Sequence, residues 1–504
     1  MIADTLELYR KYTGDETFNL IKPFDTLTDM WQARSAEYAD RVAVEDDGKS
    51  YTFAQLADDA ARFRTVLKNR GVKPSRVAIL VPNSYDFVKA FIAVTTLGCT
   101  AAILPAHLGD KAVFGCVSMF GATALITSPA TEAAAALVAQ ARPDVAVIGA
   151  TETADEPSPC EECQGSDGAT IIMTGGTTGA PKGALLSNRA VMQGVINSCL
   201  GVPGAFYNRY MLVLPLSHVF GLIRNMLASL YTGSTLFICR DNRNMFRDAA
   251  QFKPTIMVLV PALAEMAMTL SKKFGRNMFG DSLKVIICGA ANVPPYLITE
   301  YDKMGVALYP GYGLTESANL VSGNPEYLKK PDSVGLIFPG MEYQIVDGEL
   351  WLKGVNMMDG YVGRDEPDAY CDGWFRTGDL VRIDDEGFLY ITGRIKEVIV
   401  LPNGENISPA ELEAKFNTLS YIQDSQVFED VDESGRHFLA LEVVPRATET
   451  AKLGEVDLNA FLTEELQKIN AELPSFARVS KITVRTSDFE RTPSMKIVRY
   501  KKCQ

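Results

Sequence analysis

The sequence predicts an α/β protein with a large N-terminal domain of parallel β-sheets and crossover helices, a small barrel-like β part, and a small α+β C-terminal domain. Two observations support this prediction. Short β-branched runs alternate with helical patterns up to about residue 325, and from there the strand-like runs are separated by acidic and glycine-rich turns. The chain length of 504 residues is enough for two to four domains.

The N-terminal alternation begins with VAILVPN (77–83), which is followed by the apolar-periodic segment YDFVKAFIAVTTLG. Short strands linked by helical segments form parallel sheets, in which ligands bind outside the carboxyl ends of the strands. We therefore expect ligand-binding residues where these runs end. Similar runs are MLVLPLSH (211–218), STLFICR (234–240), TIMVLVP (255–261) and LKVIICGAA (283–291).

The C-terminal part begins with short strands in DGELWLKG, DGWFRTGDL and DDEGFLYITGR, which suit a small barrel or meander. From residue 397 we expect a separate α+β unit. Ser408 is a candidate helix N-cap, with Pro409 at the first helical position and Glu411 three residues after the cap. A hairpin around DESGR and an amphipathic helix in DLNAFLTEELQKINAEL follow.

Composition excludes some classes of protein. The apolar fraction of 47% and charged fraction of 22% are those of ordinary globular proteins, and the net charge of −13 argues against a nucleic-acid partner. The longest apolar stretch (91–106) is too short and interrupted for a transmembrane segment, and the N-terminus has no signal-peptide pattern. The nine scattered cysteines suit a reducing compartment, so we expect a cytoplasmic protein. The single CEEC (160–163) is expected to be a solvated loop.

The most informative segment is TGGTTGAPKG (174–183), which follows a short apolar strand. Glycine lets backbone N–H groups converge on oxygen atoms, and threonine hydroxyls and a lysine add further donors. The spacing differs from the common phosphate loop because Pro181 stands where that loop has glycine. Taken alone, the segment fits either a phosphate site or a glycine-rich and threonine-rich surface turn.

Together with six later motifs, this segment resembles the signature set of the adenylate-forming superfamily, which includes acyl-CoA synthetases, peptide-synthetase adenylation domains and beetle luciferases. The version with Gly175 in place of serine is similar to that of bacterial fatty-acid–CoA ligases. The resemblance runs from about residue 30 to residue 500. The later motifs are PLSHVFG (215–221), CGAAN (288–292), GYGLTES (311–317), WFRTGDL (374–380) with GRIKEVIVLPNGENISPAELE (393–413), and RTPSMKI (491–497).

The resemblance implies ATP, Mg²⁺ and CoA as ligands and assigns roles to individual residues. The nucleotide-binding set that it implies is Thr174, Gly175, Gly176, Thr177, Thr178, Gly179, Lys182, Gly289, Ala290, Ala291, Gly311, Tyr312, Gly313, Asp379 and Arg394. In this set Tyr312 stacks on adenine and Asp379 accepts hydrogen bonds from the ribose hydroxyls. Without the motifs, Tyr312 would be interpreted as a core aromatic, Asp379 as a turn residue and Arg394 as a surface ion pair.

The resemblance also implies the groups that promote the reaction. Attack of a carboxylate on a triphosphate needs positive charge where negative charge develops. Lys496 is expected to bridge the carboxylate and the α-phosphate, Glu316 to bind Mg²⁺, Thr315 to contact the α-phosphate, and His218 to gate the acyl pocket. By composition alone, Lys496 is a surface lysine in a basic tail and His218 a core histidine. The terminal motif departs from the family, with methionine just before Lys496 where glycine is usual.

The domains that the resemblance implies are residues 1–392 for ATP and the acyl group, a hinge at 393–396 around Lys396, and a mobile domain over 397–504. Rotation at the hinge would present Lys496 for adenylation and the NGENIS loop (403–408) for the thiol step.

The reaction expected from these features converts a carboxylic acid to acyl-AMP with release of pyrophosphate and passes the acyl group to CoA. Val219 stands where amino-acid activators have an aspartate, so an α-ammonium group would lack a partner. We therefore expect a fatty or other apolar acid without an α-amine. The alternatives are a stand-alone enzyme that loads an acyl or aryl acid onto an acyl carrier protein, and a non-catalytic nucleotide-binding protein on the same scaffold.

Overall fold

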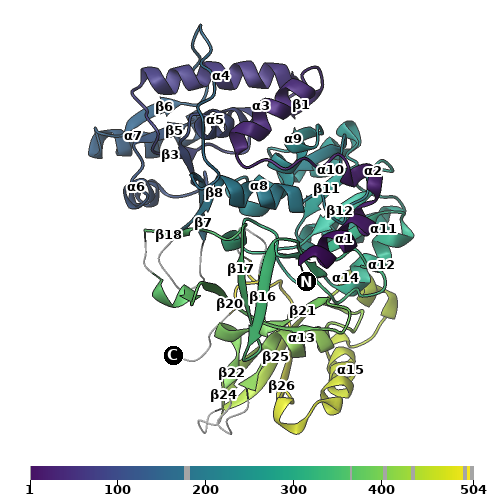
Figure 1. Ribbon diagram of the computed structural model, residues 1–504. Coiled ribbons are helices and arrows are strands. Elements are labelled where there is room, and N and C mark those ends of the chain that lie inside the picture. The colour runs from purple at the N-terminus through teal and green to yellow at the C-terminus, as the bar shows by residue number, and fades with distance from the viewer. Residues whose placement is uncertain are drawn as a thin grey trace. The chain divides into compact units, whose positions relative to one another are not determined.

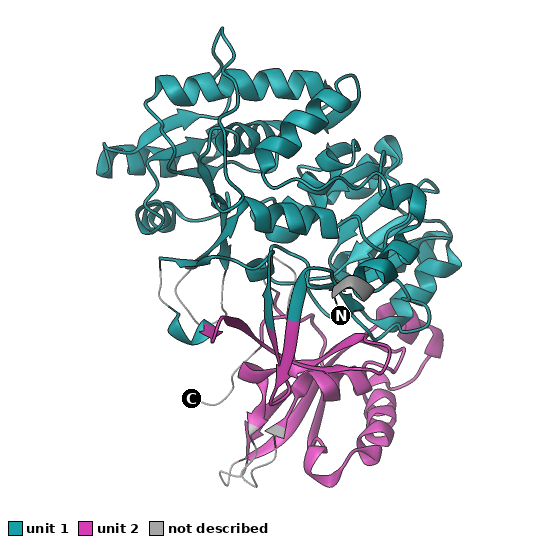
Figure 2. Ribbon diagram, in the orientation of Figure 1, with its two compact units in different colours: residues 1–342, 352–369 teal, residues 343–351, 370–504 magenta. Residues whose placement is uncertain are grey.

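The computed structural model describes residues 2–174, 182–363, 366–400, 406–432, 437–491 and 497–499. The chain forms two compact units (Figure 2). One contains residues 1–342 and 352–369, and the other contains residues 343–351 and 370–504. The strands predicted in DGELWLKG and DGWFRTGDL thus group mainly with the C-terminal part. The hinge at 393–396 and the domains on either side of it stay a prediction.

The first unit contains a seven-stranded sheet among its described residues, with the order β18-β8-β7-β4-β3-β5-β6. Strands β7, β4, β3, β5 and β6 are parallel, whereas β8 and β18 continue the sheet in antiparallel pairs. The run at 77–83 forms β3, as predicted. The bounds are β3 Arg76–Leu80, β4 Thr100–Ile103, β5 Ala124–Thr127, β6 Ala146–Gly149, β7 Gly168–Thr174, β8 Lys182–Ser187 and β18 Gly360–Val362.

A second sheet of the same unit has nine described strands in the order β15-β14-β13-β12-β11-β9-β10-β1-β2. The strands from β13 to β1 are parallel, which confirms the sequence prediction. The run at 211–218 is strand only to Leu212, and the segment that contains His218 lies beyond the strand end. The bounds are β1 Val42–Asp46, β2 Lys49–Thr52, β9 Arg209–Leu212, β10 Thr235–Ile238, β11 Ile256–Leu259, β12 Val285–Cys288, β13 Ala307–Tyr312, β14 Ser322–Gly323 and β15 Leu336–Ile337.

The helices of this unit lie on the faces of the two sheets (Figure 1). Helix α5 starts directly after β3 because the Ser84 side chain accepts a hydrogen bond from the Phe87 amide, and its apolar side chains are buried. The helices are α1 Ile2–Thr13, α2 Asp15–Phe18, α3 Leu27–Glu37, α4 Phe53–Asn69, α5 Tyr85–Thr95, α6 Asp110–Met119, α7 Glu132–Ala141, α8 Asn188–Asn197, α9 Ala228–Tyr231, α10 Met245–Phe252, α11 Pro261–Phe274, α12 Pro295–Lys303 and a π-helix Phe220–Leu227.

The β part that follows is a sheet of the order β16-β17-β20-β19, with β21 also paired to β20, and the β19–β20 and β20–β21 pairs are antiparallel. Its strands β20 and β21 carry WFRTGDL and the start of GRIKEV. The bounds are β16 Met341–Val346, β17 Glu349–Gly354, β19 Tyr370–Cys371, β20 Trp374–Ile383 and β21 Leu389–Arg394.

The remainder of the second unit is the predicted α+β part, whose core gathers Phe416, Leu441 and Leu462 from a helix, a strand and a second helix. Ser408 and Pro409 do stand at the N-cap and first position of α13, but the capping bond is absent. The Ser408 hydroxyl donates instead to the Thr392 carbonyl at 2.6 Å. The elements are β22 Ile399–Val400, β23 Asn406–Ile407, β24 Ile422–Val431, β25 His437–Pro445, β26 Lys481–Val484, α13 Pro409–Phe416, α14 Ala447–Thr450 and α15 Leu458–Glu472.

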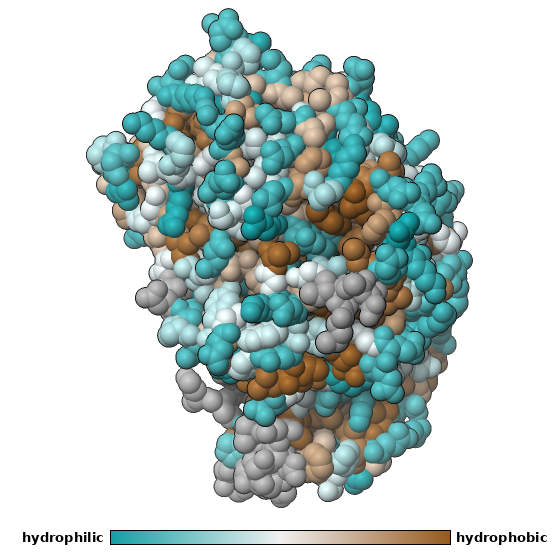
Figure 3. Space-filling model, viewed as in Figure 1, coloured by the Kyte–Doolittle hydropathy of each residue, from teal (hydrophilic) through white to brown (hydrophobic). Residues whose placement is uncertain are grey.

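The visible surface agrees with the composition. Hydrophilic side chains cover most of the face in Figure 3, and hydrophobic ones form smaller groups between them. Across the described segments, no helix has both the length and the apolar character needed to span a bilayer.

Candidate active site

The predicted adenine-contacting segments lie side by side at the carboxyl ends of β12 and β13. The two strands pair in parallel up to Cys288 and Pro310, so Gly289 continues next to Gly311. A Cβ on Gly289 would lie 3.0 Å from the Gly311 carbonyl oxygen, and one on Gly313 would lie 1.3 Å from the Asn319 carbonyl oxygen. Gly313 requires glycine because neighbouring backbone passes too close for a side chain, whereas a Cβ at Gly289 would need the Gly311 backbone to shift by a few tenths of an ångström. Ala290 and Ala291 follow with exposed side chains, and Tyr312, which ends β13, is partly exposed.

Thr315 and Glu316 lie just beyond β13 in a short 3₁₀ helix, Thr315–Ser317. Residues 356–358 hold this 3₁₀ turn in place by hydrogen bonds. The Met358 amide donates to the Glu316 carbonyl at 2.8 Å, and the Asn356 side chain donates to the carbonyls of Ser317 and Leu320, each at 2.9 Å. The backbone that carries the Glu316 carboxylate is therefore held by residues about 40 positions further along the chain.

The glycine-rich loop connects β7 to β8, and Thr174 pairs with Lys182 at its base. Gly175, Gly176, Thr177, Thr178 and Gly179 lie outside the described residues. The Lys182 ammonium lies 3.7 Å from the centre of the Tyr361 ring and 3.5 Å from the Glu366 carboxylate. The lysine is thus held by a cation–π contact and an ion pair at the base of the loop.

Tyr361 joins the two motifs. It lies on β18, which pairs with β8, and its hydroxyl donates to Glu316 Oε1 at 2.7 Å. The structure therefore brings Lys182 and Glu316 to the two sides of one tyrosine, although they lie in separate motifs of the sequence. Tyr361 was not predicted from the sequence, because a three-residue strand in an irregular segment has no periodic pattern. We call Lys182, Tyr361 and Glu316 the tyrosine cluster.

His218 lies between β9 and the π-helix and is partly buried. Asn83, which follows β3 in the other sheet, holds the segment that precedes His218 by two hydrogen bonds. Its amide donates to the Leu214 carbonyl at 2.8 Å and accepts from the Leu216 amide at 2.9 Å. Gly221 permits the tight turn after His218, since a Cβ there would lie 2.3 Å from the Pro215 carbonyl oxygen. π-helices are rare and are frequent at functional sites.

In the second unit, Asp379 and Arg394 face each other across β20 and β21. Arg394 Nε donates to Asp379 Oδ1 at 2.6 Å. The Asp379 side chain is only 2% exposed, whereas that of Arg394 is 50% exposed. Just before Asp379 in β20, the Gly378 amide donates to Glu349 Oε1 at 2.9 Å. A carboxylate can accept several hydrogen bonds.

Lys496 lies outside the described residues, but both sides of its segment are held in the second unit. Arg491 pairs with Asp424 at 2.5 Å, and the two Nη atoms of Arg499 each lie 2.7 Å from a Glu413 oxygen. Burial opposes the charge of Arg499, but the hydrogen bonds with Glu413 outweigh it and raise the Arg499 pKa.

Arg499 Nε also lies 3.0 Å from the Glu397 carboxylate, next to the predicted hinge residue Lys396. The segment that follows Lys496 is therefore tied to the residues around Lys396. Lys396 itself is exposed, in the 3₁₀ helix Ile395–Glu397.

The strand ends and the tyrosine cluster are features of α/β proteins that bind nucleotides, since the ligands of such sheets bind at the carboxyl ends of the strands. The fold matches a solved anthranilate CoA ligase in complex with anthranoyl-AMP, with a TM-score of 0.83 over 94% of this chain and 95% of that chain, at 19% identity. A family model described as AMP-binding enzyme matches residues 31–362, and one for the AMP-binding enzyme C-terminal domain matches 396–504. The chain belongs to the AMP-binding enzyme family.

Curated relatives agree in the kind of enzyme and differ in the acid. An oxalate–CoA ligase of Arabidopsis thaliana is 28% identical over 94% of this chain and 97% of its own length. A long-chain-fatty-acid–CoA ligase of Mycobacterium tuberculosis is 30% identical over 80% of this chain and 84% of its own length. The predicted enzyme class, an AMP-forming acid–thiol ligase, is therefore confirmed at the level of the family.

Proposed function

We propose that this enzyme activates a carboxylic acid as acyl-AMP, with release of pyrophosphate, and then transfers the acyl group to CoA. The observation that carries the proposal is the tyrosine cluster, because it joins the lysine of the glycine-rich loop to the carboxylate of GYGLTES. A phosphate chain needs a cation, and a Mg²⁺ ion bound to phosphates needs one or two protein carboxylates. The cluster supplies one of each.

The donor set fits magnesium. Among the described residues there is no group of three or more His, Cys, Asp or Glu side chains that could hold a metal unaided. A single carboxylate, Glu316, suits Mg²⁺, which keeps waters and takes its other ligands from substrate phosphates. When bound, the ion would neutralise charge on the phosphates. Lys182 would exchange its ion pair with Glu366 for phosphate oxygens.

We propose the remaining roles from the sequence motifs. Asp379 accepts hydrogen bonds from the ribose hydroxyls and Arg394 supports it. Tyr312 stacks on adenine, His218 borders the acyl group, and Thr315 contacts the α-phosphate. The loop residues Thr174 to Gly179 donate to the phosphates. Gly289, Ala290, Ala291, Gly311 and Gly313 provide the backbone surface for the base.

The proposed role of Lys496 separates the two half-reactions. Lys496→Ala should abolish formation of the adenylate, because the developing charge at the α-phosphate loses its cation. The same variant should convert supplied acyl-AMP and CoA to acyl-CoA at close to the normal rate. Equal loss of both half-reactions would remove the assignment of Lys496 to adenylation and of Lys396 to a hinge between two poses.

The acid is proposed to lack an α-ammonium group, because Val219 offers that group no charge partner. The apolar acid expected from the sequence stays a prediction, and the cavity described below favours a different acid.

The test of the reaction is ATP-dependent pyrophosphate release over fatty, aryl, dicarboxylic and amino acids, with and without CoA, with mass spectrometry of the products. Multiple turnovers that need one acid class and CoA would support the proposal. Acid-dependent release that stops after one turnover despite CoA would contradict CoA as the acceptor and favour a carrier protein. Absence of release with every acid would contradict the proposal and favour a binding protein.

A further inference from the structure

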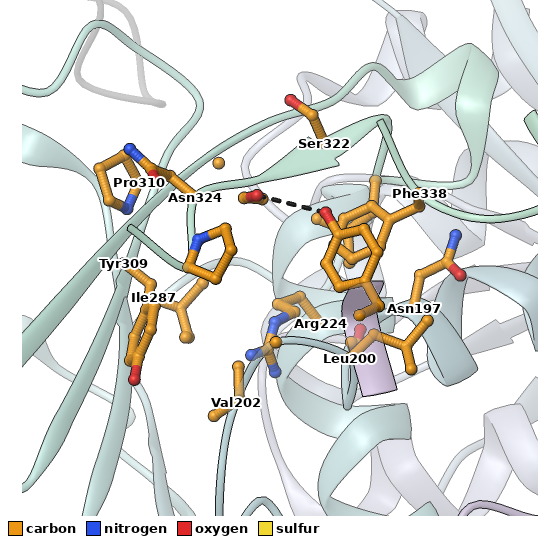
Figure 4. A pocket seen from close by; sticks show the side chains of 17 residues that line it. Asn197, Leu200, Val202, Arg224, Ile287, Tyr309, Pro310, Ser322, Asn324 and Phe338 are labelled. Carbon is orange, nitrogen blue, oxygen red and sulfur yellow. Dashed lines mark hydrogen bonds between the residues drawn. The ribbon is translucent and has the colours of Figure 1, made fainter. Parts of the chain in front are cut away.

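The first unit contains a cavity next to the strand ends that carry the GYGLTES motif. Its volume is about 30 Å³, and it is partly open to solvent. Gly311 of that motif lines it, together with Ile287 of β12 and Arg224 of the π-helix that begins just after His218. Figure 4 shows Arg224 among the lining residues, with Ile287 on one side and Leu200 on the other. The cavity therefore shares residues with the proposed nucleotide site and with the segment that borders the acyl group.

Among the described residues, no carboxylate balances the charge of Arg224. The residue is 2% exposed, its Nη1 atom has no hydrogen-bond partner, and no carboxylate among the described residues pairs with the guanidinium. Its titratable neighbours are Tyr210 and Cys199. Burial raises the pKa of Tyr210, and it raises that of the Cys199 thiol to about 12, so both are neutral at physiological pH. A buried cation is unfavourable unless something pairs with it.

The other buried arginines show what a purely structural role looks like in this unit. Arg34 pairs with Glu37 at 2.7 Å, and Arg64 donates to the Ser158 carbonyl and the Thr96 hydroxyl. Apart from the Tyr210 hydroxyl, which interacts with the guanidinium, Arg224 has no such partner within the described part of the chain. A structural arginine is thus an unsatisfactory account of Arg224, and a ligand that brings an anion would supply the missing partner.

A second donor lines the same cavity. Asn197 is 1% exposed and its Nδ2 atom has no hydrogen-bond partner, while its Oδ1 atom accepts from Gln193 Nε2 at 2.9 Å. The Gln193 contact therefore orients the amide with its NH₂ group unpaired. Arg224 and Asn197 both offer donors, and a carboxylate is an acceptor without a proton to donate.

We propose that Arg224 and Asn197 bind a second carboxylate of the acid, so that the substrate is a short dicarboxylic acid. One carboxylate reacts with ATP and the other is held by the guanidinium. This inference rests on the proposed ligase function and refines its substrate, in place of the fatty or apolar acid predicted from the sequence. A fatty acid of equal length would leave both donors buried without acceptors, which a polar site penalises strongly.

The test compares linear acids that differ only in the terminal group: succinate with butyrate, glutarate with pentanoate, and adipate with hexanoate. We expect kcat/KM for pyrophosphate release to favour the dicarboxylate of one pair by about 10²-fold or more, because loss of a designed polar contact has effects of this order or larger. Arg224→Gln should remove that preference, lowering kcat/KM for the dicarboxylate about 10²-fold while changing that for the monocarboxylate by less than about threefold.

Controls separate binding from folding. Arg276→Gln, at an exposed arginine, should leave both acids unaffected, and circular dichroism should show Arg224→Gln folded. If Arg224→Gln does not fold, Asn197→Asp tests the same site, because an added negative charge should repel the second carboxylate and abolish the preference. Calorimetric titration of the wild-type enzyme with each dicarboxylate, without ATP, measures the site without the reaction.

The results also separate this inference from the proposed function. Turnover of monocarboxylates with no preference for any dicarboxylate, or an equal loss for both acids in Arg224→Gln, would overturn the inference and leave the ligase intact. Binding of a dicarboxylate that depends on Arg224, with no pyrophosphate release from any acid, would support the site and overturn the ligase function.

Discussion

Removal of one oxygen atom from the tyrosine cluster should slow adenylation without unfolding the protein. Tyr361→Phe keeps the ring beneath Lys182 and deletes the hydroxyl that donates to Glu316 at 2.7 Å. A hydrogen bond to a charged group contributes about 1.5–3 kcal/mol. Since about 1.4 kcal/mol is a factor of ten, kcat/KM for ATP should fall roughly 10- to 100-fold if Glu316 must be held in place to bind Mg²⁺.

The assay is the initial rate of pyrophosphate release as a function of Mg²⁺ at fixed ATP. The loss in Tyr361→Phe should be largest at low Mg²⁺, because a loosely held carboxylate binds the ion less well. Tyr361→Leu also removes the ring beside the Lys182 ammonium, so it should lose a further factor that corresponds to about 0.5–2 kcal/mol of cation–π energy. A matched control is Tyr343→Phe, at a tyrosine that is 39% exposed, and it should behave as wild type.

Two results would refute this reasoning. A Tyr361→Phe enzyme within about twofold of wild type at all Mg²⁺ concentrations would show that the hydroxyl does not position a metal-binding carboxylate, since the expected bond is far stronger than that. A loss that is the same at every Mg²⁺ concentration and is accompanied by a lower melting temperature would show a structural role only.

Other changes probe the surroundings of the site. Gly313→Ala should lower the melting temperature and abolish activity, because its Cβ would lie 1.3 Å from a carbonyl oxygen. The control Gly115→Ala lies in a helix with open space and should raise the unfolding free energy in denaturant titrations by about 0.5–1 kcal/mol. Arg499→Gln leaves Glu413, which is 7% exposed, without its cation and should lower the unfolding free energy by about 3–5 kcal/mol. The double variant Arg499→Gln with Glu413→Gln should recover part of this loss if the two residues act as one unit. Burial raises the Cys199 pKa to about 12, above its value of about 9 in the unfolded chain, so the folded state retains the thiol proton at higher pH. The unfolding free energy should therefore fall as pH rises above about 9, and it should fall less steeply in Cys199→Ala. An unchanged slope in that variant would contradict the assignment.

The sequence predicted well what depends on local pattern. Alternating apolar runs placed β3, β9, β10, β11 and β12 in parallel sheets, because buried strands and amphipathic helices each have a periodic signature. The sequence placed the GAA segment at the end of such a run, but it did not predict that the GYG segment lies beside it. The roles of Glu316, Asp379 and Lys496 came only from the resemblance and stay proposals.

What the sequence did not reveal depends on contacts between distant segments. Tyr361, Asn83 and Arg224 have no distinctive pattern in the sequence around them. Tyr361 reaches Glu316 because β18 pairs with β8, and Asn83 binds the segment before His218 because β3 ends beside it. Arg224 lines the cavity because the π-helix carries it there. Ser408 is a case in which the local sequence pattern did not predict the contact that the structure contains. Its local pattern predicted an N-cap, and Ser408 does stand at that position, but its hydroxyl makes no capping bond and donates to the distant Thr392 carbonyl.

The π-helix that carries Arg224 also makes this part of the enzyme sensitive to chain length. A π-helix places its hydrogen bonds one residue further along than an α-helix does, so it accommodates an extra residue in a turn. Each residue of an α-helix advances about 100° around the axis, from its 3.6 residues per turn. Deleting one residue between His218 and Arg224 would let the segment rewind as an α-helix and swing the guanidinium about a quarter turn away from the cavity. Insertions and deletions at this one place could therefore exchange the class of acid without altering any residue that contacts ATP.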